Sequence, residues 1–280
     1  MNALPRWRTE VRDGVVYVTG REAKSVLSRA RSGPGSVVII GAGAAGHAAA
    51  ETLRGEGYAG SVVVIDPDPD APYDRPNLSK DYLAGDAPEE WIPLRPPEFY
   101  AEHGIERVVK RAISIDGEKR TVALDDGTTV EYGALLIATG AAPIRPPIPG
   151  AAQPHVHVLR SLADCRAVMH AALTAQSAVI AGASFIGLEA AAALRKWGID
   201  VTVVAPELVP FEKSLGRELG AAVRAAHEGH GVRFRLGRTL REIDAHDVIL
   251  DNGDRIPASL VLLGVGVRPV LDLAAAAVSS

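Results

Sequence analysis

The sequence predicts an α/β fold of two three-layer units, each with a parallel sheet, covering helices and a small β-meander. Two observations lead to this prediction. A β-branched run followed by a glycine-rich turn and an alanine-rich helix occurs in 36–53 and again in 179–194. Each pattern is followed by an Asp-Gly or Asn-Gly turn between β-rich runs, which is typical of a hairpin.

The first pattern fills the stretch from Ser36 to Asp66, SVVIIGAGAAGHAAAETLRGEGYAGSVVVID. Residues 37–40 are β-branched and apolar, which indicates a strand buried on both faces. A helix starts around Ala48, and a second apolar strand, 62–65, ends on the acid. The order of strand, turn, helix and strand predicts a βαβ unit.

Each glycine of this turn has a physical role. Gly41 allows the tight turn, Gly43 lets the backbone approach a pyrophosphate, and Gly46 lets the helix pack on the strand. The free N–H groups at the start of the helix favour an anion. Asp66 follows the last glycine by about 20 residues, where dinucleotide-binding units place a carboxylate for the adenosine ribose. The stretch therefore predicts a Rossmann-like dinucleotide site rather than a turn without a ligand.

The composition is that of an ordinary globular α/β chain. Of the 280 residues 47% are hydrophobic, and the formal net charge is −4. No basic patch indicates nucleic acid, and no apolar run is long enough to span a bilayer. The start, MNALPRWRTEV, lacks the apolar core of a signal peptide, so we expect a cytoplasmic location. The single cysteine, Cys165, excludes a disulfide or an all-protein iron–sulfur site within this chain.

Other segments suggest the domain organisation. The β-rich runs 7–11 and 15–18 predict a hairpin, and a polar linker follows, so 1–35 is expected to be a separate segment. After Asp66 the run PDPDAPYDRPNLSKDYLAGDAPEEW is rich in proline and turn residues, which is typical of a functional loop. A proline-rich run near 145–154 predicts the boundary between a first domain, 36–150, and a second, 151–280.

An internal repeat relates the two predicted units. The turn 41–46 corresponds to 182–187, and the Asp-Gly turn at 126–127 corresponds to the Asn-Gly turn at 252–253. A repeat kept only for packing need not retain the glycine turn in both copies. The sequence therefore favours two dinucleotide sites over one.

The second copy departs from the first at two positions. Ser184 replaces the middle glycine, but serine is small enough for close phosphate approach, and its hydroxyl can help cap the helix. Ala205 stands where the first copy has Asp66, and the nearest acid is Glu207. No arginine or histidine cluster follows Val204 to bind a 2′-phosphate, which favours NADH over NADPH.

Two charged residues admit both a structural and a functional interpretation. Glu189 lies early in the second predicted helix, where the helix dipole alone can stabilise it, but a buried functional acid fits the same position. Lys80 is open to the same two interpretations, as a solvated side chain or a functional one. The histidines have no Cys, Asp or Glu at metal-ligand spacing beside them, so we expect no metal site.

Five motifs together carry a family resemblance. They are GAGAAG with Asp66, YDRPNLSK at 73–80, Ala-Thr-Gly at 138–140, GASFIGLE at 182–189 and GVGVRP at 264–269. In this order they resemble the two-dinucleotide flavoprotein reductases of the FAD/NAD-dependent pyridine nucleotide-disulfide oxidoreductase superfamily. The YDRPNLSK loop and FIGLE resemble its ferredoxin-reductase and apoptosis-inducing-factor branch.

The resemblance implies FAD in the first site and NAD(H) in the second. It also implies a catalytic pair, Lys80 and Glu189, largely desolvated beside the flavin, and a backbone contact from Ala112 to adenine. With Glu207 added from the reasoning above, the cofactor-binding residues are Gly41, Gly43, Ala44, Ala45, Gly46, Asp66, Arg75, Lys80, Ala112, Thr139, Gly140, Gly182, Ala183, Ser184, Phe185, Ile186, Gly187, Glu207, Gly264 and Gly266.

The resemblance further implies a direction of electron flow. Hydride passes from NADH to FAD, and single electrons pass on to an iron–sulfur partner, either a separate electron-transfer protein or a fused Rieske domain. Lys80 would favour the negative charge of reduced flavin. Branches that reduce disulfides carry a cysteine pair that this chain lacks, so disulfide reduction is not expected.

The chain departs from the family at both ends. It stops at Ser280, before the family's second flavin-contacting motif and C-terminal interface domain, and LPRWRTEVRDGVVYV resembles the closing strands of a Rieske domain. We therefore expect a fragment of a Rieske–flavoprotein fusion from an NADH-dependent reductase. The alternatives are an NAD(H)/FAD-binding signalling module of the apoptosis-inducing-factor type and a truncated fragment without independent activity.

Overall fold

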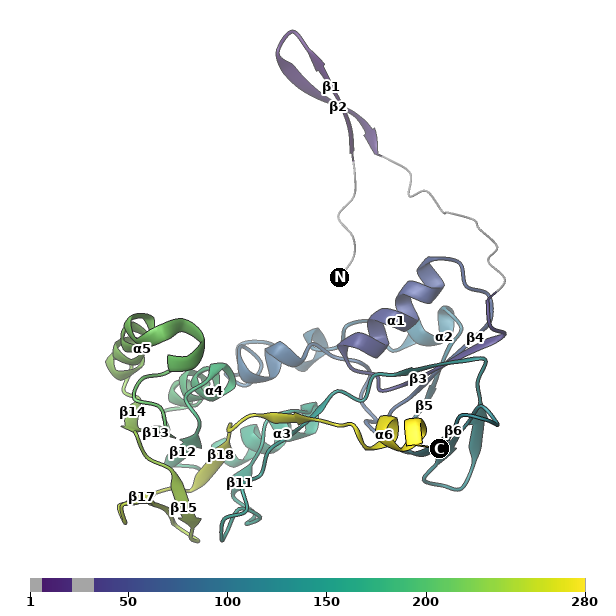
Figure 1. Ribbon diagram of the computed structural model, residues 1–280. Coiled ribbons are helices and arrows are strands. Elements are labelled where there is room, and N and C mark those ends of the chain that lie inside the picture. Colours follow the sequence, from purple (N-terminus) through teal and green to yellow (C-terminus); the bar gives the residue numbers. More distant parts are fainter. Residues whose placement is uncertain (1–6, 22–32, 280) are drawn as a thin grey trace.

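The computed structural model describes residues 7–21 and 33–279. Within this part of the chain, two parallel sheets form the centres of two units at opposite ends of the main body (Figure 1). The α/β class and the parallel sheets predicted from the sequence are confirmed.

The first unit contains a parallel sheet of strand order β5-β4-β3-β9. Its helices and strands are β3 (Ser36–Ile40), α1 (Ala44–Gly55), β4 (Ser61–Ile65), α2 (Glu98–Glu102), β5 (Ile105–Val108), β6 (Ala112–Asp116), β7 (Thr121–Leu124), β8 (Thr129–Glu131) and β9 (Ala134–Ile137). The strands β6, β7 and β8 form the expected antiparallel meander.

Successive side chains of a strand point to opposite sides, so the apolar strands present apolar side chains on both faces of this sheet. Both faces are covered. Ile39 packs with Ala50 of α1 on one face. Its neighbour Val38 packs with Val122 of the meander on the other face. Helices, sheet and meander therefore form the three predicted layers, and the β-branched strand is buried on both sides.

The second unit repeats this arrangement around a sheet of order β11-β18-β12-β13-β14. Its elements are β11 (Val156–His157), α3 (Leu162–Ala172), β12 (Ser177–Ala181), α4 (Phe185–Lys196), β13 (Asp200–Ala205), α5 (Glu212–Gly229), β14 (Arg233–Leu236), β15 (Leu240–Ile243), β16 (Asp247–Leu250), β17 (Arg255–Pro257) and β18 (Leu260–Leu263). Ile180 packs with Leu188 of α4, and Val179 packs with Val248 of the meander.

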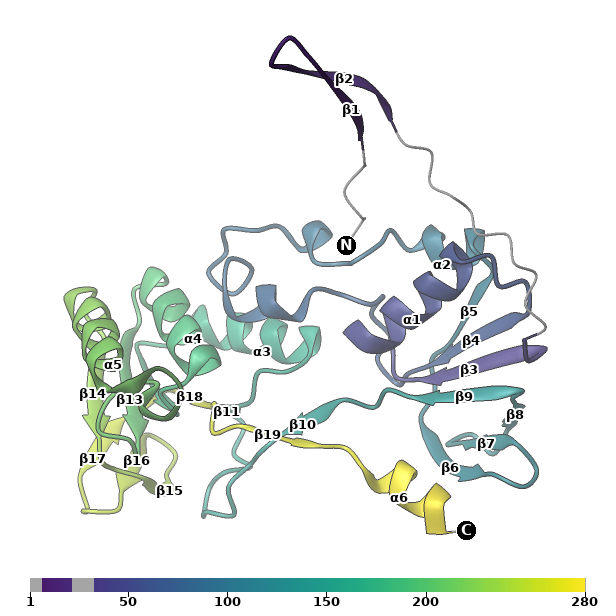
Figure 2. The ribbon, with the colours of Figure 1, turned by 45° about the horizontal axis from the view of Figure 1, so that its top comes forward.

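The irregular run after Asp66 lies between the two units (Figure 2). It contains two short 3₁₀ helices, η1 (Arg75–Ser79) and η2 (Glu89–Trp91). Its apolar residues Leu78 and Leu83 belong to the same buried cluster as Leu188 of α4. The predicted functional loop thus follows the first unit in sequence but is packed into the core of the second.

The C-terminal segment does not stay in the second unit, although the predicted second domain, 151–280, includes it. Strand β19 (Val267–Pro269) pairs antiparallel with β10 (Ala141–Pro143), and α6 (Asp272–Ser279) then follows. Leu273 of α6 packs in the first unit's cluster of sheet and meander residues. The chain therefore returns to the first unit after β18, because the apolar face of α6 is covered there.

The predicted N-terminal hairpin is confirmed as β1 (Trp7–Arg12) and β2 (Val15–Arg21). Among the described residues these strands pair only with each other, and they lie away from the main body in Figure 1. All but one of their residues are exposed, among them Trp7 and Tyr17. Most of the predicted linker, 22–32, lies outside the described residues.

Candidate dinucleotide sites

The first glycine turn accepts no side chain at two of its three glycines. Gly41 has a φ of +107°, and a Cβ there would lie 2.2 Å from the carbonyl oxygen of Ala138. A Cβ on Gly46 would lie 1.8 Å from the carbonyl oxygen of Gly41. At Gly43, by contrast, a Cβ would meet only the Arg75 side chain, at 3.6 Å. The turn is therefore closed toward the protein at Gly41 and Gly46 and open toward a ligand at Gly43.

The predicted acid lies directly against this turn. The backbone N–H of Ala42 donates to Asp66 Oδ2 at 2.5 Å, and that of Asp68 donates to Oδ1 at 2.8 Å. Ala44 and Ala45 are exposed at the start of α1, where the free N–H groups of the helix lie. The turn, the acid and the helix start thus form one polar edge at the carboxyl ends of β3 and β4.

Three other predicted residues of the first unit make contacts within the protein, and the backbone N of Thr139 lies 3.3 Å from the Cβ position of Gly41. Ala112 is buried between sheet and meander. The Thr139 hydroxyl donates to the carbonyl oxygen of Val270 at 2.7 Å, so it contacts the returning C-terminal segment. Gly140 has a φ of +68° and accepts a hydrogen bond from the N–H of Val270 at 3.0 Å.

A cavity of about 270 Å³ lies where the loop meets the second unit. Lys80 Nζ lies 3.8 Å from Glu189 Oε1, so the structure brings the two predicted partners together. The Lys80 side chain is 50% exposed and that of Glu189 is 30% exposed. Both side chains line an open cavity, so the chain alone leaves the pair partly exposed, and the expected desolvation beside a flavin stays a prediction.

Two arginines line the same cavity, the predicted residue Arg75 and a second one, Arg160, that was not predicted. Arg75 Nη1 donates to the carbonyl oxygen of Arg160 at 3.3 Å, and Arg160 Nε donates to that of Ala141 at 3.0 Å. Burial, together with the nearby Arg75 charge, lowers the pKa of Arg160. Two adjacent guanidinium groups favour an anionic ligand. Arg160 follows a two-residue strand, and no periodic signal distinguishes it in the sequence.

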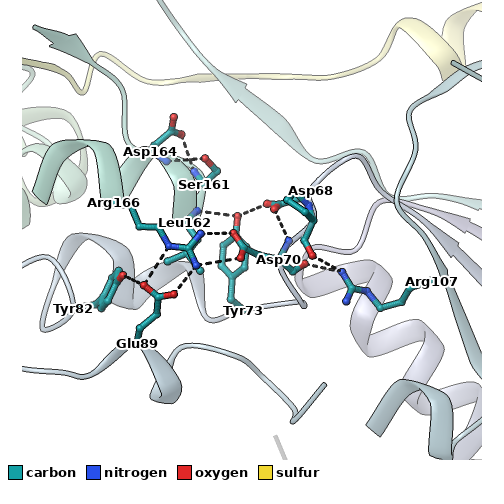
Figure 3. A network of polar contacts seen from close by, with 11 residues as sticks. Asp68, Asp70, Tyr73, Tyr82, Glu89, Arg107, Ser161, Leu162, Asp164 and Arg166 are labelled. Atoms are coloured by element: carbon teal, nitrogen blue, oxygen red, sulfur yellow. Dashed lines mark hydrogen bonds and ion pairs between the residues drawn. The ribbon is translucent and has the colours of Figure 1, made fainter. Parts of the chain in front are cut away.

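A polar network fixes the loop against α3 (Figure 3). Arg166 of α3 binds Asp70 at 2.9 Å and Glu89 at 2.5 Å. The Tyr73 hydroxyl donates to Asp68 at 2.8 Å and accepts from the N–H of Leu162 at 3.1 Å. Burial and the bond to Asp68 raise the pKa of Tyr73 to about 12, so the hydroxyl stays protonated at neutral pH.

A second cavity of about 580 Å³ opens over the second glycine turn. Gly182 has a φ of +110°, and a Cβ there would lie 2.4 Å from the carbonyl oxygen of Gly264. A Cβ on Gly187 would lie 2.1 Å from the carbonyl oxygen of Gly182. Predicted residues at the cavity wall are Gly182, Ala183, Ser184, Phe185, Glu207, Gly264 and Gly266.

Two predictions about this turn need correction. Ser184 is the N-cap residue of α4, but its side chain makes no capping hydrogen bond, so the expected contribution of the hydroxyl is wrong. Ile186 lines the first cavity beside Glu189 instead of the second. The physical reason is the helical rotation, which turns residue 186 toward the loop while Phe185 faces the second cavity.

The rim of the second cavity carries an arginine that the sequence did not lead us to expect. Glu207 Oε1 lies 3.3 Å from Lys213 Nζ, as a sequence-local pair. Arg238 also lines the cavity, because its backbone N–H donates to the carbonyl oxygen of Ala205 at 3.1 Å. Arg238 was not predicted from the sequence, because it does not follow Val204 but comes after the neighbouring strand β14.

The single cysteine of the sequence is a packing residue. Cys165 is fully buried and donates to the carbonyl oxygen of Leu78 at 3.2 Å. Burial raises the pKa of its thiol to about 12, which suits an inert packing residue. Within the ranges 7–21 and 33–279, no group of three His, Cys, Asp or Glu side chains is placed to hold a metal. The helices of the same ranges include none that is long and apolar enough to cross a membrane.

Two glycine-turn units, with one cavity over the second turn and another between the loop and the second unit, define a protein of the two-dinucleotide class. The family model for pyridine nucleotide-disulphide oxidoreductases matches residues 35–279. The chain therefore belongs to this family, as its motifs led us to expect.

The relatives include electron-transfer reductases. Rhodocoxin reductase of Rhodococcus erythropolis is 40% identical over 246 residues, which cover 86% of this chain and 58% of that protein. Apoptosis-inducing factor 3 of Homo sapiens is 31% identical over 290 residues, covering 96% of this chain and 47% of that protein. The 96% share means that this second match extends into residues 1–35.

A solved structure of a reductase has the same fold as this chain. The ferredoxin reductase of Rhodopseudomonas palustris superposes with a TM-score of 0.83 at 36% identity. The matched region covers 86% of this chain and 61% of that protein. The chain thus spans about 60% or less of the length of the relatives named here.

Proposed function

We propose that this chain is the FAD- and NADH-binding part of a reductase that passes electrons to a ferredoxin- or Rieske-type iron–sulfur protein. The observation that carries the proposal is the Lys80–Glu189 contact at 3.8 Å. It lies in a cavity that is lined by residues of the loop after the first glycine turn and of the helix after the second. Ligands bound at the two turns would approach each other there. The names of the relatives, rhodocoxin reductase and ferredoxin reductase, support the activity.

The first turn fits the pyrophosphate and adenosine of FAD. Gly43 leaves room for a phosphate beside the first N–H groups of α1, and the Arg75 guanidinium at 3.6 Å from that open position supplies positive charge. Asp66 would accept hydrogen bonds from the ribose with lone pairs that Ala42 and Asp68 leave free. We propose these residues, with Arg160, as the FAD-binding set.

Bound FAD would accept a hydride and release electrons one at a time, chemistry that no side chain supplies. The chain's own contribution would be electrostatic. The Lys80 ammonium would favour negative charge at the flavin, and Glu189 would hold the ammonium at the cavity wall. A half-exposed ion pair at 3.8 Å is weak in water, so the attraction between the two charges would grow as a ligand excludes solvent from the cavity.

The second turn fits the pyrophosphate of NADH. Glu207 would accept hydrogen bonds from the adenosine ribose, which disfavours a 2′-phosphate at the same place. Lys213 and Arg238 at the rim reduce that discrimination, so the proposal is a preference for NADH and not exclusion of NADPH. We propose a cytoplasmic location for this activity.

The test is reconstitution of the purified chain with FAD followed by NADH oxidation with ferricyanide and with a ferredoxin as acceptors. The proposal predicts a yellow protein that turns over with both. A chain that remains colourless with excess FAD would contradict it.

One observation favours a second candidate function. The match to apoptosis-inducing factor 3 of Homo sapiens covers 96% of this chain, whereas the match to rhodocoxin reductase covers 86%. An NAD(H)/FAD-binding module that signals by conformational change would bind FAD and NADH but show turnover near zero with both acceptors.

A further inference from the structure

The Ser79 hydroxyl makes a polar contact between the loop and α4 of the second unit. Its Oγ donates to Glu189 Oε2 at 2.6 Å, although Ser79 belongs to η1 and Glu189 to α4. Ser79 is only 5% exposed. The alternative acceptor, the carbonyl oxygen of Pro76, lies 3.4 Å away, so the single hydroxyl proton is directed to the carboxylate.

The geometry divides the carboxylate between two partners. Ser79 holds Oε2, and Lys80 Nζ lies 3.8 Å from Oε1. The terminal torsion of a glutamate is broad, so a carboxylate with no fixed donor samples many orientations. Lys80 is half exposed and cannot fix it alone. The short bond from a buried hydroxyl is the contact that can.

We propose that Ser79 is a positioning residue that orients Glu189 so that its free oxygen holds the Lys80 ammonium against the cavity. This inference rests on the proposed function, because the cavity is where the flavin would bind. Ser79 itself acts only through Glu189. Its neighbour along the chain, Lys80, is the group that would contact the cofactor.

A purely structural role for Ser79, as a tie between loop and α4, is the competing explanation. Other contacts already hold the loop on the second unit. Arg166 binds Asp70 and Glu89, the Tyr73 hydroxyl binds the N–H of Leu162, and Cys165 contacts Leu78. Removal of one hydroxyl should therefore leave the loop in place but release the carboxylate.

The test compares Ser79→Ala, Ser79→Thr and Lys80→Ala with the wild-type chain, all loaded with FAD. Stopped-flow absorbance gives the rate of FAD reduction by NADH, and a reductive titration without NADH gives the midpoint potential. FAD affinity and the melting temperature are measured in parallel. Ser79→Ala is expected to slow reduction about tenfold and to shift the potential to more negative values, the direction expected for Lys80→Ala. Ser79→Thr, which keeps the hydroxyl, should restore both.

Three results would overturn the proposal. One is a Ser79→Ala variant with the wild-type rate and potential. Another is a potential that shifts opposite to that of Lys80→Ala. A third is a loss of FAD affinity and of thermal stability that is the same in Ser79→Ala and in Ser79→Thr, which would mean that Ser79 has a structural role. If NADH fails to reduce FAD bound to the wild-type chain, the proposed function is wrong. The midpoint potentials of the three variants, which are measured without NADH, still test the positioning role of Ser79.

Discussion

Gly46 lies so close to Gly41 that a Cβ on Gly46 would stand 1.8 Å from the carbonyl oxygen of Gly41. Gly46→Ala must therefore push α1 away from β3, which should destabilise the fold by about 1–3 kcal/mol and weaken FAD binding. Gly55, in the last turn of the same helix, has no atom within 4 Å of its Cβ position. Gly55→Ala is the matched control and should be neutral or slightly stabilising. Urea unfolding checks both, and equal stability of the two variants would contradict the close contact.

Asp66 accepts hydrogen bonds from the N–H groups of Ala42 and Asp68. Asp66→Ala leaves both donors without this acceptor, at a cost of about 1–3 kcal/mol for a buried donor, and removes the proposed ribose partner. FAD affinity should fall about tenfold or more, with Asp66→Asn intermediate because it keeps one oxygen. Fluorescence titration of FAD measures the effect. Wild-type affinity in Asp66→Ala would exclude Asp66 from the site.

Lys80→Ala should slow the reduction of bound FAD by tenfold or more and change FAD affinity by less than about threefold. The reason is that Lys80 makes only a half-exposed contact in the protein, while its charge would act on the reduced state of the flavin. Lys196→Ala is the control, since Lys196 pairs with Asp86 at similar exposure away from both cavities. Equal losses in rate and affinity would leave Lys80 as a binding group only.

Glu207→Ala should raise the KM for NADH about three- to tenfold and increase the use of NADPH relative to NADH. Without the carboxylate, Lys213 and Arg238 are the charges that remain at the cavity rim, and both favour a 2′-phosphate. Glu228→Ala, which breaks a pair with Arg224 on α5, is the control. Steady-state kinetics with both nucleotides decide the matter, and an unchanged KM would remove Glu207 from the ribose site.

Stability should fall as the pH is lowered from about 7 to 5. Burial lowers the pKa of four histidines below the value of 6.5 that they have when exposed; they are His47, His155, His157 and His227. The unfolded chain therefore binds more protons in this range, and each unit of pKa difference costs about 1.4 kcal/mol at low pH. Urea midpoints at pH 7.5 and 5.0 test this. The drop should be smaller in His47→Gln, and a midpoint that rises at pH 5.0 would contradict the sign.

The separate elements of the fold could be predicted because their signals are short-range. The β-branched strand before Gly41, the turn at 41–46 and its copy at 182–187 follow from residue types within a few positions of one another. The hairpin at 7–21 follows from its Asp-Gly turn. By contrast, the end of the second unit could not be predicted, because β19 leaves it to pair with β10, more than a hundred residues earlier.

The sequence by itself determined the two glycine turns, since a φ near +110° and contacts of about 2 Å at the Cβ position admit only glycine. It also determined the family, through motifs that are local. Only the tertiary structure decided the rest of the candidate site. Ser79 reaches Glu189 across 110 residues of sequence, and Arg160 and Arg238 reach the two cavities from the segments after the edge strands β11 and β14. Contacts of this kind depend on how the two units and the loop pack together. Residues that are so far apart in the sequence leave no periodic pattern that would predict their contact.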